Sequence, residues 1–251
     1  MSHRFVLRAV IACMVIALFV SILSPVTPAA EPEKIRILLT YGGHGFQQEP
    51  FFAMFDAMEG IEYEKCPLPQ SADRFAPGLE EDIDVIVMYD MCGQFTTEQQ
   101  AAFLKLLKER GIGLVSLHHN LGAHRSWPEY TKIIGGKYVF APEEIEGEMR
   151  GKSTYSHDED LDIKVADADH PITAGLEGFT IHDETYGNFF TSKNARVLLT
   201  TDHPKNSPSI LWVQQYGKSP VCYFMLGHDG KSYANPNLSA VIVRAIRWAA
   251  Q

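Results

Sequence analysis

The sequence is poor in the residues and motifs that mark several large classes of protein. Four cysteines occur in 251 residues, and no two of them form a Cys-x-x-Cys pair, which argues against a disulfide-dense secreted module. The G-x-S-x-G nucleophile elbow, the phosphate-binding P-loop and the His-Glu-x-x-His metal motif are also missing. The chemistry of this chain must therefore be sought in a less regular set of side chains.

Basic residues are outnumbered by acidic ones. The chain has 22 lysines and arginines against 31 aspartates and glutamates, which gives a formal net charge of −9. Such a charge repels the phosphates of nucleic acids and of anionic lipids. We therefore expect no nucleic-acid partner.

The first 30 residues predict a secretion signal. Arg4 and Arg8 precede an unbroken apolar run over residues 9–23, and a segment rich in proline and small residues follows, which is the order found in signal peptides. The run is shorter than the roughly 20 residues that span a bilayer, so an uncleaved anchor is the weaker alternative. We expect cleavage after Ala29 or Ala30.

Removal of this signal changes both charge and location. Arg4 and Arg8 are its only charged residues, so the net charge of the mature chain would be −11 instead of −9. The mature protein is predicted to be periplasmic or extracellular, with no integral membrane span after cleavage. An exported protein lacks access to the cytosolic nicotinamide pool, so no nicotinamide or flavin cofactor is expected.

Apolar runs alternate with helical patterns from about residue 35 onward. We predict one domain over residues 31–251 with an α/β fold, a doubly wound and mostly parallel sheet flanked by helices. In such sheets ligands bind outside the carboxyl ends of the strands. The runs that predict strands are residues 35–40, 61–65, 84–89, 112–117, 195–200, 210–214 and 221–226.

Capping residues predict the ends of one central helix. Thr96 with Gln99, or Thr97 with Gln100, forms a capping box at its start. Gly111 is suited to end the same helix, because glycine adopts the left-handed conformation of a C-cap.

Two later stretches differ in character. Residues 138–181 are irregular and rich in acidic side chains, which indicates a solvated surface. Residues 238–249 have the apolar spacing of a final amphipathic helix, with Pro236 in its first turn.

Histidines occur where predicted strands end. His44 follows the first strand, His118 and His119 follow the fourth, and His182 and His228 follow later apolar runs. Because the carboxyl ends of parallel strands meet at one edge of a sheet, we expect these side chains to gather there. Adjacent side chains at a strand end diverge, so one of His118 and His119 should face the pocket, and we assign His119 to it.

Glu184 is the carboxylate that we expect in this group. It is two residues from His182, so on an extended segment both side chains project to the same side. His157, His170 and His203 lie in polar, turn-like contexts, and we interpret them as structural or surface residues.

Two chemistries suit several histidines with one carboxylate. Neutral imidazoles and a carboxylate bind Zn²⁺, Mn²⁺ or a similar ion and leave a position open for substrate. Alternatively, histidine and glutamate act without a metal as general acid and base. The spacing of the residues does not decide between them.

At several ordered positions the chain resembles the ThuA-like (trehalose utilisation) domain family. The resemblance covers residues 35–250. The matching segments are the glycine-histidine loop 42–45, the strand end 113–119, residues 127–136, residues 170–172, the His-Asp-Glu-Thr-Tyr box 182–186 and residues 227–229.

The resemblance implies a fold and a field of activity. The fold would be that of the class I glutamine amidotransferase-like superfamily, which is flavodoxin-like in its sheet. The activity would belong to carbohydrate utilisation and act on a 3-keto sugar or glycoside by isomerisation, elimination or hydrolysis. Glutaminase activity is not expected, because the turn after the fourth strand reads His-His-Asn and lacks a nucleophilic cysteine.

We assign the reaction to four residues by their position. His182 and Glu184 would be metal ligands or acid and base, and His228 and His119 would be the opposing groups. If a divalent ion is bound, Zn²⁺ or Mn²⁺, its predicted ligands are His182, Glu184 and His228.

Three further residues are predicted to bind substrate. His44 and Tyr186 would orient sugar hydroxyls, and Trp127 would stack on a sugar ring. The expected partner is a small-molecule sugar or glycoside. The sequence does not decide whether the protein forms an oligomer. A non-catalytic carbohydrate-binding or assembly protein on the same fold is the alternative function.

Overall fold

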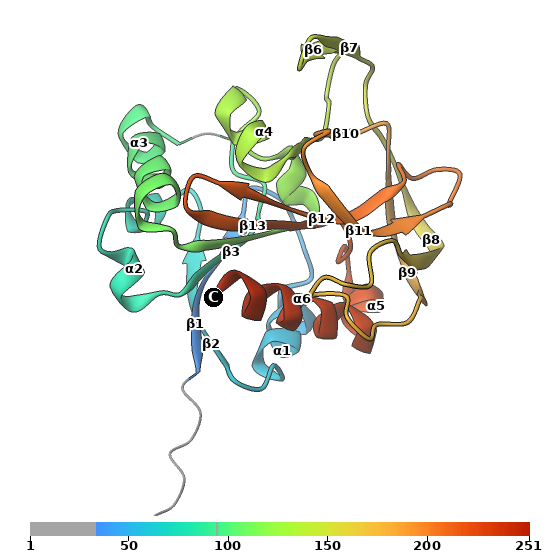
Figure 1. Ribbon diagram of the computed structural model, residues 1–251, viewed down its shortest axis with the longest axis horizontal. Helices are drawn as coiled ribbons and strands as arrows, with labels where there is room; N and C mark the ends of the chain where they lie inside the picture. Colours follow the sequence, from blue (N-terminus) through green and yellow to red (C-terminus); the bar gives the residue numbers. More distant parts are fainter. Residues whose placement is uncertain (1–33, 94) are drawn as a thin grey trace, which may run out of the picture. The chain divides into compact units, whose positions relative to one another are not determined.

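The computed structural model describes residues 34–93 and 95–251. Most of its strands join into a single large sheet (Figure 1). These strands are β1 (Ile35–Gly42), β2 (Ile61–Pro67), β3 (Val85–Asp90), β4 (Gly113–Leu117), β8 (Thr154–Val165), β9 (Phe179–Gly187), β11 (Arg196–Thr201), β12 (Ser209–Tyr216) and β13 (Ser219–Phe224). In the described residues they form a nine-stranded sheet in the order β2-β1-β3-β4-β13-β12-β11-β8-β9.

The first half of the sheet is parallel. β1 pairs in parallel with β2 and β3, and β4 pairs in parallel with β3 and β13. All side chains of β3 and β4 are buried, as expected for strands that helices cover on both faces. The strand order reverses between β1 and β3, and this switch point is where α/β sheets bind ligands.

The second half of the sheet is antiparallel. β13, β12, β11, β8 and β9 each pair in the antiparallel sense with the next strand in the sheet order. A tight turn joins β12 to β13 at Gly217, whose φ is +60°. A Cβ atom at Gly217 would lie 2.4 Å from the Cα of Lys108, so a side chain does not fit in this turn.

Helices cover both faces of the sheet, which confirms the predicted doubly wound α/β fold with a mostly parallel or mixed sheet. In Figure 1, α1, α5 and α6 lie on one side, and α3 and α4 lie on the other. The helices are α1 (Gln48–Asp56), α2 (Leu79–Asp82), α3 (Thr97–Lys105), α4 (Pro128–Ile134), α5 (Gly230–Tyr233) and α6 (Pro236–Ala249), and the shorter helical turns are η1 (Ala72–Arg74), η2 (Leu106–Arg110) and η3 (His118–Gly122).

The capping signals of the sequence are present in the structure. Thr96 accepts a hydrogen bond from the Gln99 backbone N–H, and the Gln99 side chain accepts one from the Thr96 backbone, which completes the capping box. Gly111 ends the following turn with a φ of +85°. Asn235 caps α6 through a hydrogen bond from the Asn237 backbone.

The acidic stretch 138–181 contains more regular structure than its composition indicated. β8 runs through it as a long strand beside β9, although Asp158 and Asp160 are exposed as expected. A bulge between Ser156 and Glu159 interrupts the pairing, and Asp158 within it has a φ of +57°. The bulge contains His157, which lines the cavity of the candidate site.

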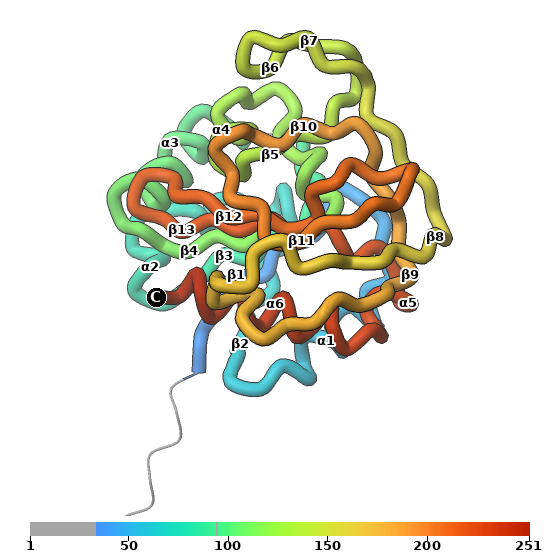
Figure 2. Tube along the Cα trace, turned by 45° about the vertical axis from the view of Figure 1, so that its right-hand side comes forward, coloured from blue at the N-terminus to red at the C-terminus, as the bar shows by residue number. Residues whose placement is uncertain are grey.

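Two small two-stranded sheets accompany the large one. β5 (Gly136–Lys137) pairs with β10 (Phe190–Thr191), and β6 (Glu143–Ile145) pairs with β7 (Glu148–Arg150). Figure 2 shows the β6–β7 hairpin standing out at the top, away from the nine-stranded sheet.

The predicted secretion signal, residues 1–30, lies outside the described residues. Within the part of the chain that the structure does describe, no helix has the length and apolar character needed to cross a membrane.

Candidate functional site

A cavity of about 300 Å³ opens at the carboxyl edge of the parallel strands. His44 reaches it from the loop after β1, His119 from the turn after β4, and His228 from the loop after β13. Glu184 reaches it from β9 in the antiparallel half. The cavity is lined by His44, Met91, His119, Gly122, Tyr138, Phe140, Tyr155, His157, Glu184, Tyr186 and His228.

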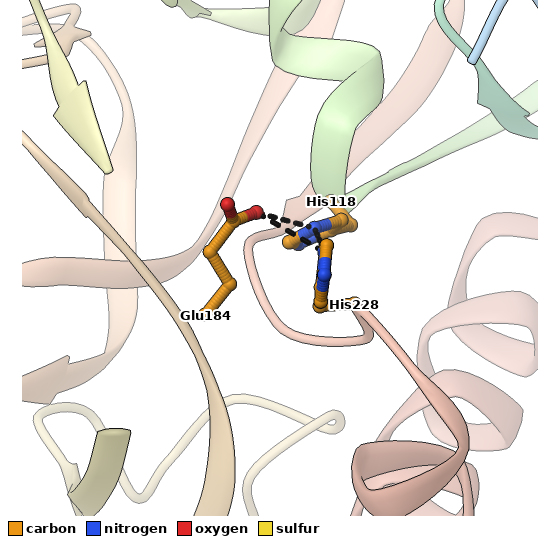
Figure 3. Close-up of side chains that lie close together, drawn as sticks. All are labelled: His118, Glu184 and His228. Atoms are coloured by element: carbon orange, nitrogen blue, oxygen red, sulfur yellow. Dashed lines mark hydrogen bonds and ion pairs between the residues drawn. The ribbon is translucent and has the colours of Figure 1, made fainter. Parts of the chain in front are cut away.

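The side chains of His118, Glu184 and His228 converge on one point (Figure 3). Glu184 and His228 line the cavity, whereas His118 is fully buried. His118 Nε2 lies 3.2 Å from Glu184 Oε2, and His228 Nδ1 lies 3.2 Å from the same oxygen. The two imidazole nitrogens are 3.3 Å apart. We call these three residues the His118–Glu184–His228 cluster.

The backbone at the end of β4 presents His118 to the cluster. His118 has a φ of +44°, an uncommon conformation that the surroundings must stabilise. The Tyr223 hydroxyl donates to the His118 carbonyl at 2.8 Å, which fixes this sharp turn. His118 Nδ1 lies 2.7 Å from the Met225 carbonyl. A carbonyl only accepts, so Nδ1 carries the hydrogen and Nε2 is left facing Glu184.

Glu184 and His228 stabilise each other's charged forms. Burial by itself raises the pKa of Glu184, but the hydrogen bonds with His118 and His228 hold that pKa well below its usual range. The hydrogen bond with Glu184 raises the pKa of His228, against an opposing effect of burial. A positive charge at this point is therefore strongly favoured, whether a proton or a metal ion carries it.

The donor set fits a divalent metal. His118 Nε2, Glu184 Oε2 and His228 Nδ1 all lie within 4.8 Å of one another. Around a tetrahedral zinc ion with bonds of about 2.0–2.1 Å, neighbouring ligand atoms are about 3.3 Å apart, which matches the three separations. The His118 Nδ1–H bond to a backbone carbonyl is also the outer-shell contact that orients metal-bound histidines.

Asp183 connects β9 to the loop that carries His228. Its carboxylate is completely buried and accepts backbone hydrogen bonds from Gly227 at 2.7 Å and from His228 at 2.9 Å. It also accepts one from the Glu184 backbone at 2.8 Å. Asp183 therefore sets the position of both Glu184 and His228.

Across the cavity, His119 presents a fixed hydrogen-bond acceptor. Its Nε2 lies 2.9 Å from the Tyr89 carbonyl, so Nε2 carries the hydrogen and Nδ1 has the lone pair. Burial, with the neighbouring His118 and His44, holds the pKa of His119 well below its usual range. His119 is therefore neutral and serves as an acceptor instead of an acid.

The remaining polar residues lie around the cluster. His44 stacks on His119 with ring centroids 4.9 Å apart. The Tyr186 hydroxyl lies 3.1 Å from His118 Nε2, and its ring stacks on His118 at 5.0 Å. His157 Nδ1 lies 3.3 Å from Glu184 Oε1. The sequence analysis interpreted His157 as a structural or surface residue, and it is exposed. It also lines the cavity, which the acidic stretch around it does not reveal.

Of the predicted site residues, the structure brings His44, His119, Glu184, Tyr186 and His228 together around the cavity. The structure adds His118 to this set. The sequence analysis assigned His119, not His118, to the pocket. His119 does line the cavity, but His118 is the residue that completes the cluster. The catalytic roles assigned to these residues stay predictions.

His182 lies apart from the cluster. Its Nδ1 is 2.8 Å from Asp160 and its Nε2 is 3.2 Å from Asp158, and the ring is part of a surface ion network with Lys231. His182 and Glu184 thus belong to the same strand, but His182 is neither part of the cluster nor among the residues that line the cavity.

Trp127 also lies away from the cavity. Its ring is 7% exposed and packs against Phe103, His124 and Tyr130. It is absent from the residues that line the cavity. The structure therefore places Trp127 in the hydrophobic core instead of beside a bound sugar.

A family comparison identifies the chain. The model of the family described as "ThuA: Trehalose utilisation" matches residues 40–249. The chain belongs to the ThuA family. This confirms the resemblance seen in the sequence and places the protein in carbohydrate utilisation. Among curated proteins, no match was found.

Solved structures of ThuA-like proteins have the same fold. A ThuA-like protein from Parabacteroides merdae superposes with a TM-score of 0.73 at 18% identity, covering 87% of this chain and 91% of that one. One from Bacteroides uniformis gives 0.65 at 18% identity, covering 89% and 95%. A cytoplasmic protein from Salmonella typhimurium gives 0.58 at 13% identity, covering 85% and 99%.

The fold is that of the class I glutamine amidotransferase-like proteins, as the sequence predicted. In this ThuA protein the sharp turn after β4 carries His118 where a nucleophile would be expected.

Proposed function

We propose that this ThuA protein is an enzyme that acts on a keto-sugar or a keto-glycoside at the His118–Glu184–His228 cluster, with the help of a divalent metal ion. The observation that carries the proposal is the convergence of two imidazole nitrogens and one carboxylate oxygen, with separations of 3.2–3.3 Å, beside a cavity that Glu184 and His228 line. Family membership in trehalose utilisation supports a sugar as substrate.

The chemistry follows from the ketone. A carbonyl at C3 of a pyranose acidifies the C–H bond at C2. Loss of the C2 proton to a base, followed by departure of the C1 glycosidic oxygen with a proton, gives an unsaturated keto sugar and the free alcohol. Return of the proton at another carbon would give isomerisation instead. A bound Zn²⁺ or Mn²⁺ would polarise the ketone oxygen and stabilise the enolate charge.

The residues around the cluster supply the other functions. We assign proton transfer to His157, because its Nδ1 lies 3.3 Å from Glu184 Oε1 and its ring lines the cavity. His119 Nδ1 accepts a hydrogen bond from a sugar hydroxyl, because this histidine is held neutral. His44, exposed beside it, binds a second hydroxyl.

Titration with Zn²⁺ and Mn²⁺ tests the proposed metal site. We expect the protein to bind one ion per chain, and we expect E184Q and H118N to lower the affinity at least about 100-fold because each removes a ligand atom. Asparagine is chosen at position 118 because it tolerates a positive φ.

H182Q is the matched control for this titration. It removes a histidine from the same strand but outside the cluster, so the affinity should stay close to that of the parent protein. Absence of saturable binding would favour the non-catalytic carbohydrate-binding alternative. An equal loss of metal affinity in H182Q would instead support the ligands predicted from the sequence, which are His182, Glu184 and His228.

We further propose that the protein is exported, on the basis of the order of charged, apolar and small residues in positions 1–30. Cleavage is expected after Ala29 or Ala30. N-terminal sequencing of protein recovered from the periplasm or the medium tests this, and an intact N-terminus beginning at Met1 would contradict it.

A further inference from the structure

Part of the cavity wall is aromatic, and the rings of Tyr138, Phe140 and Tyr155 contribute to it. Tyr138 contacts both Phe140, at 4.9 Å between ring centroids, and Tyr186, at 5.3 Å. Because Tyr186 stacks on His118, these ring contacts connect the aromatic wall to the His118–Glu184–His228 cluster.

Tyr155 stands out from the other rings by its exposure. In the described residues it is one of two large hydrophobic side chains that are exposed, at 62% of its surface. The other, Met149, is on the β6–β7 hairpin. The Tyr155 ring contacts the His157 ring at 5.3 Å, edge to face, so most of the ring surface remains available to a ligand.

The register of the sheet places Tyr155 one strand away from the reacting centre. Tyr155 on β8 pairs with Tyr186 on β9, and Tyr186 stacks on His118. Neighbouring strands are about 4.8 Å apart. A pyranose bound at the cluster would leave a second, linked ring at the level of Tyr155.

The charge of the lining defines the ligand further. The residues that line the cavity include no lysine and no arginine, and their ionisable carboxylate is Glu184. A phosphorylated or carboxylated sugar would meet no basic partner there and would be repelled by Glu184. The wall is suited to the apolar C–H face of an uncharged sugar ring.

We infer that Tyr155 determines specificity: its exposed ring is the platform for the second ring of an uncharged two-ring glycoside, the class to which trehalose belongs, so that such a glycoside binds in preference to a one-ring or phosphorylated sugar. This inference rests on the proposed function, because it takes the cluster as the position of the first ring. It assigns to Tyr155 a role in specificity that neither the sequence motifs nor the family description contains.

Binding measurements with unoxidised probes test the inference without requiring turnover. The probes are trehalose as the two-ring ligand, methyl α-glucoside as the one-ring ligand and trehalose 6-phosphate as the charged ligand. Affinities are measured by ligand-observed NMR for the full protein and for Y155A, Y155W and M149A. M149A is the control, because it removes the other exposed apolar side chain at a distance from the cavity.

The expected result is a preference of the parent protein for trehalose over both other probes. Y155A should lower the ratio of trehalose to methyl glucoside affinity about 10-fold, which corresponds to about 1.4 kcal/mol, whereas Y155W should keep the ratio and M149A should not change it. Failure of the parent protein to prefer trehalose, or an unchanged ratio in Y155A, would overturn the inference. A protein that shows no turnover but whose ratio of trehalose to methyl glucoside affinity depends on Tyr155 would support the role of Tyr155. The same result would count only against the proposed enzyme activity.

Discussion

His124 is a buried histidine that the site does not use. Neither ring nitrogen finds a hydrogen-bond partner in the part of the chain that the structure describes. Its ring is 4.3 Å from Phe95 and 4.5 Å from Tyr130, measured between centroids. Burial among these rings lowers the pKa of His124 to about 4.

This buried imidazole should make the fold sensitive to acid. In the unfolded chain a histidine takes up a proton near pH 6.5, but in the folded protein His124 stays neutral until about pH 4. Its contribution to stability is therefore complete above pH 6.5 and is lost as the pH falls towards 4. Between pH 7.5 and pH 4.5 the loss is about 2–3 kcal/mol.

H124F should remove that part of the pH dependence. The change in packing is the same at both pH values, so the informative quantity is the difference between the unfolding free energies at pH 7.5 and pH 4.5, from denaturant titrations. We expect this difference to shrink by about 2 kcal/mol. F55L, a packing change on α1 whose ring contacts are with Phe51 and Tyr63 instead of His124, introduces no titrating group and should leave this difference unaltered. An H124F protein with the same acid sensitivity as the parent would disprove the assignment.

At the scale of single residues, the sequence predicted the composition of the site better than its geometry. The rule that strand ends meet at one edge brought His44, His119 and His228 to the cavity. This rule could not predict which way the side chains of His118 and His119 point, because their orientation depends on the positive φ of His118 and on the hydrogen bond from Tyr223 to the His118 carbonyl.

At the scale of elements, the site depends on how β9 is joined to the loop after β13. Asp183 makes this connection with three backbone N–H groups. A carboxylate has enough lone pairs for all three donors, whereas an amide offers one oxygen and a nitrogen that itself donates. The connection therefore requires an acid at this position.

D183N should displace the loop and weaken the cluster. We expect metal affinity to fall about 10–100-fold, as for outer-shell partners of metal ligands, together with a loss of stability of about 1–3 kcal/mol from unpaired buried groups. The two effects are measured by metal titration and by denaturant unfolding. D162N, which makes the same change on an exposed carboxylate of β8, is the control. Unchanged metal affinity in D183N would refute this role.

The two halves of the sheet were not equally predictable. β1, β3 and β4 are short, largely apolar runs whose central residues are buried, so their pattern identifies them. β8 alternates buried and exposed residues only in its second part, and its first part contains the bulge. The acidic residues there indicated surface, and Asp158, Asp160, Tyr155 and His157 are all exposed. The composition did not indicate that Tyr155 and His157 also line the cavity.

At the scale of the whole described chain, the cavity belongs to both halves of the sheet. The parallel half supplies His118 and His228 at its carboxyl edge, where doubly wound folds bind ligands. The antiparallel half supplies Glu184, His157 and Tyr155. Neither half holds the cluster alone, because its carboxylate and its imidazoles come from different halves.

The role of the His118–Glu184–His228 cluster as reacting centre is tested most directly by turnover of a 3-keto-glycoside such as 3-keto-trehalose, measured as kcat/KM with and without added Zn²⁺ or Mn²⁺. We expect product formation that depends on the ion. The value of kcat/KM should fall at least about 100-fold in E184Q and H118N and change less than about threefold in H182Q. Full activity in E184Q and H118N, or equal loss in H182Q, would contradict the claim that the His118–Glu184–His228 cluster is the reacting centre.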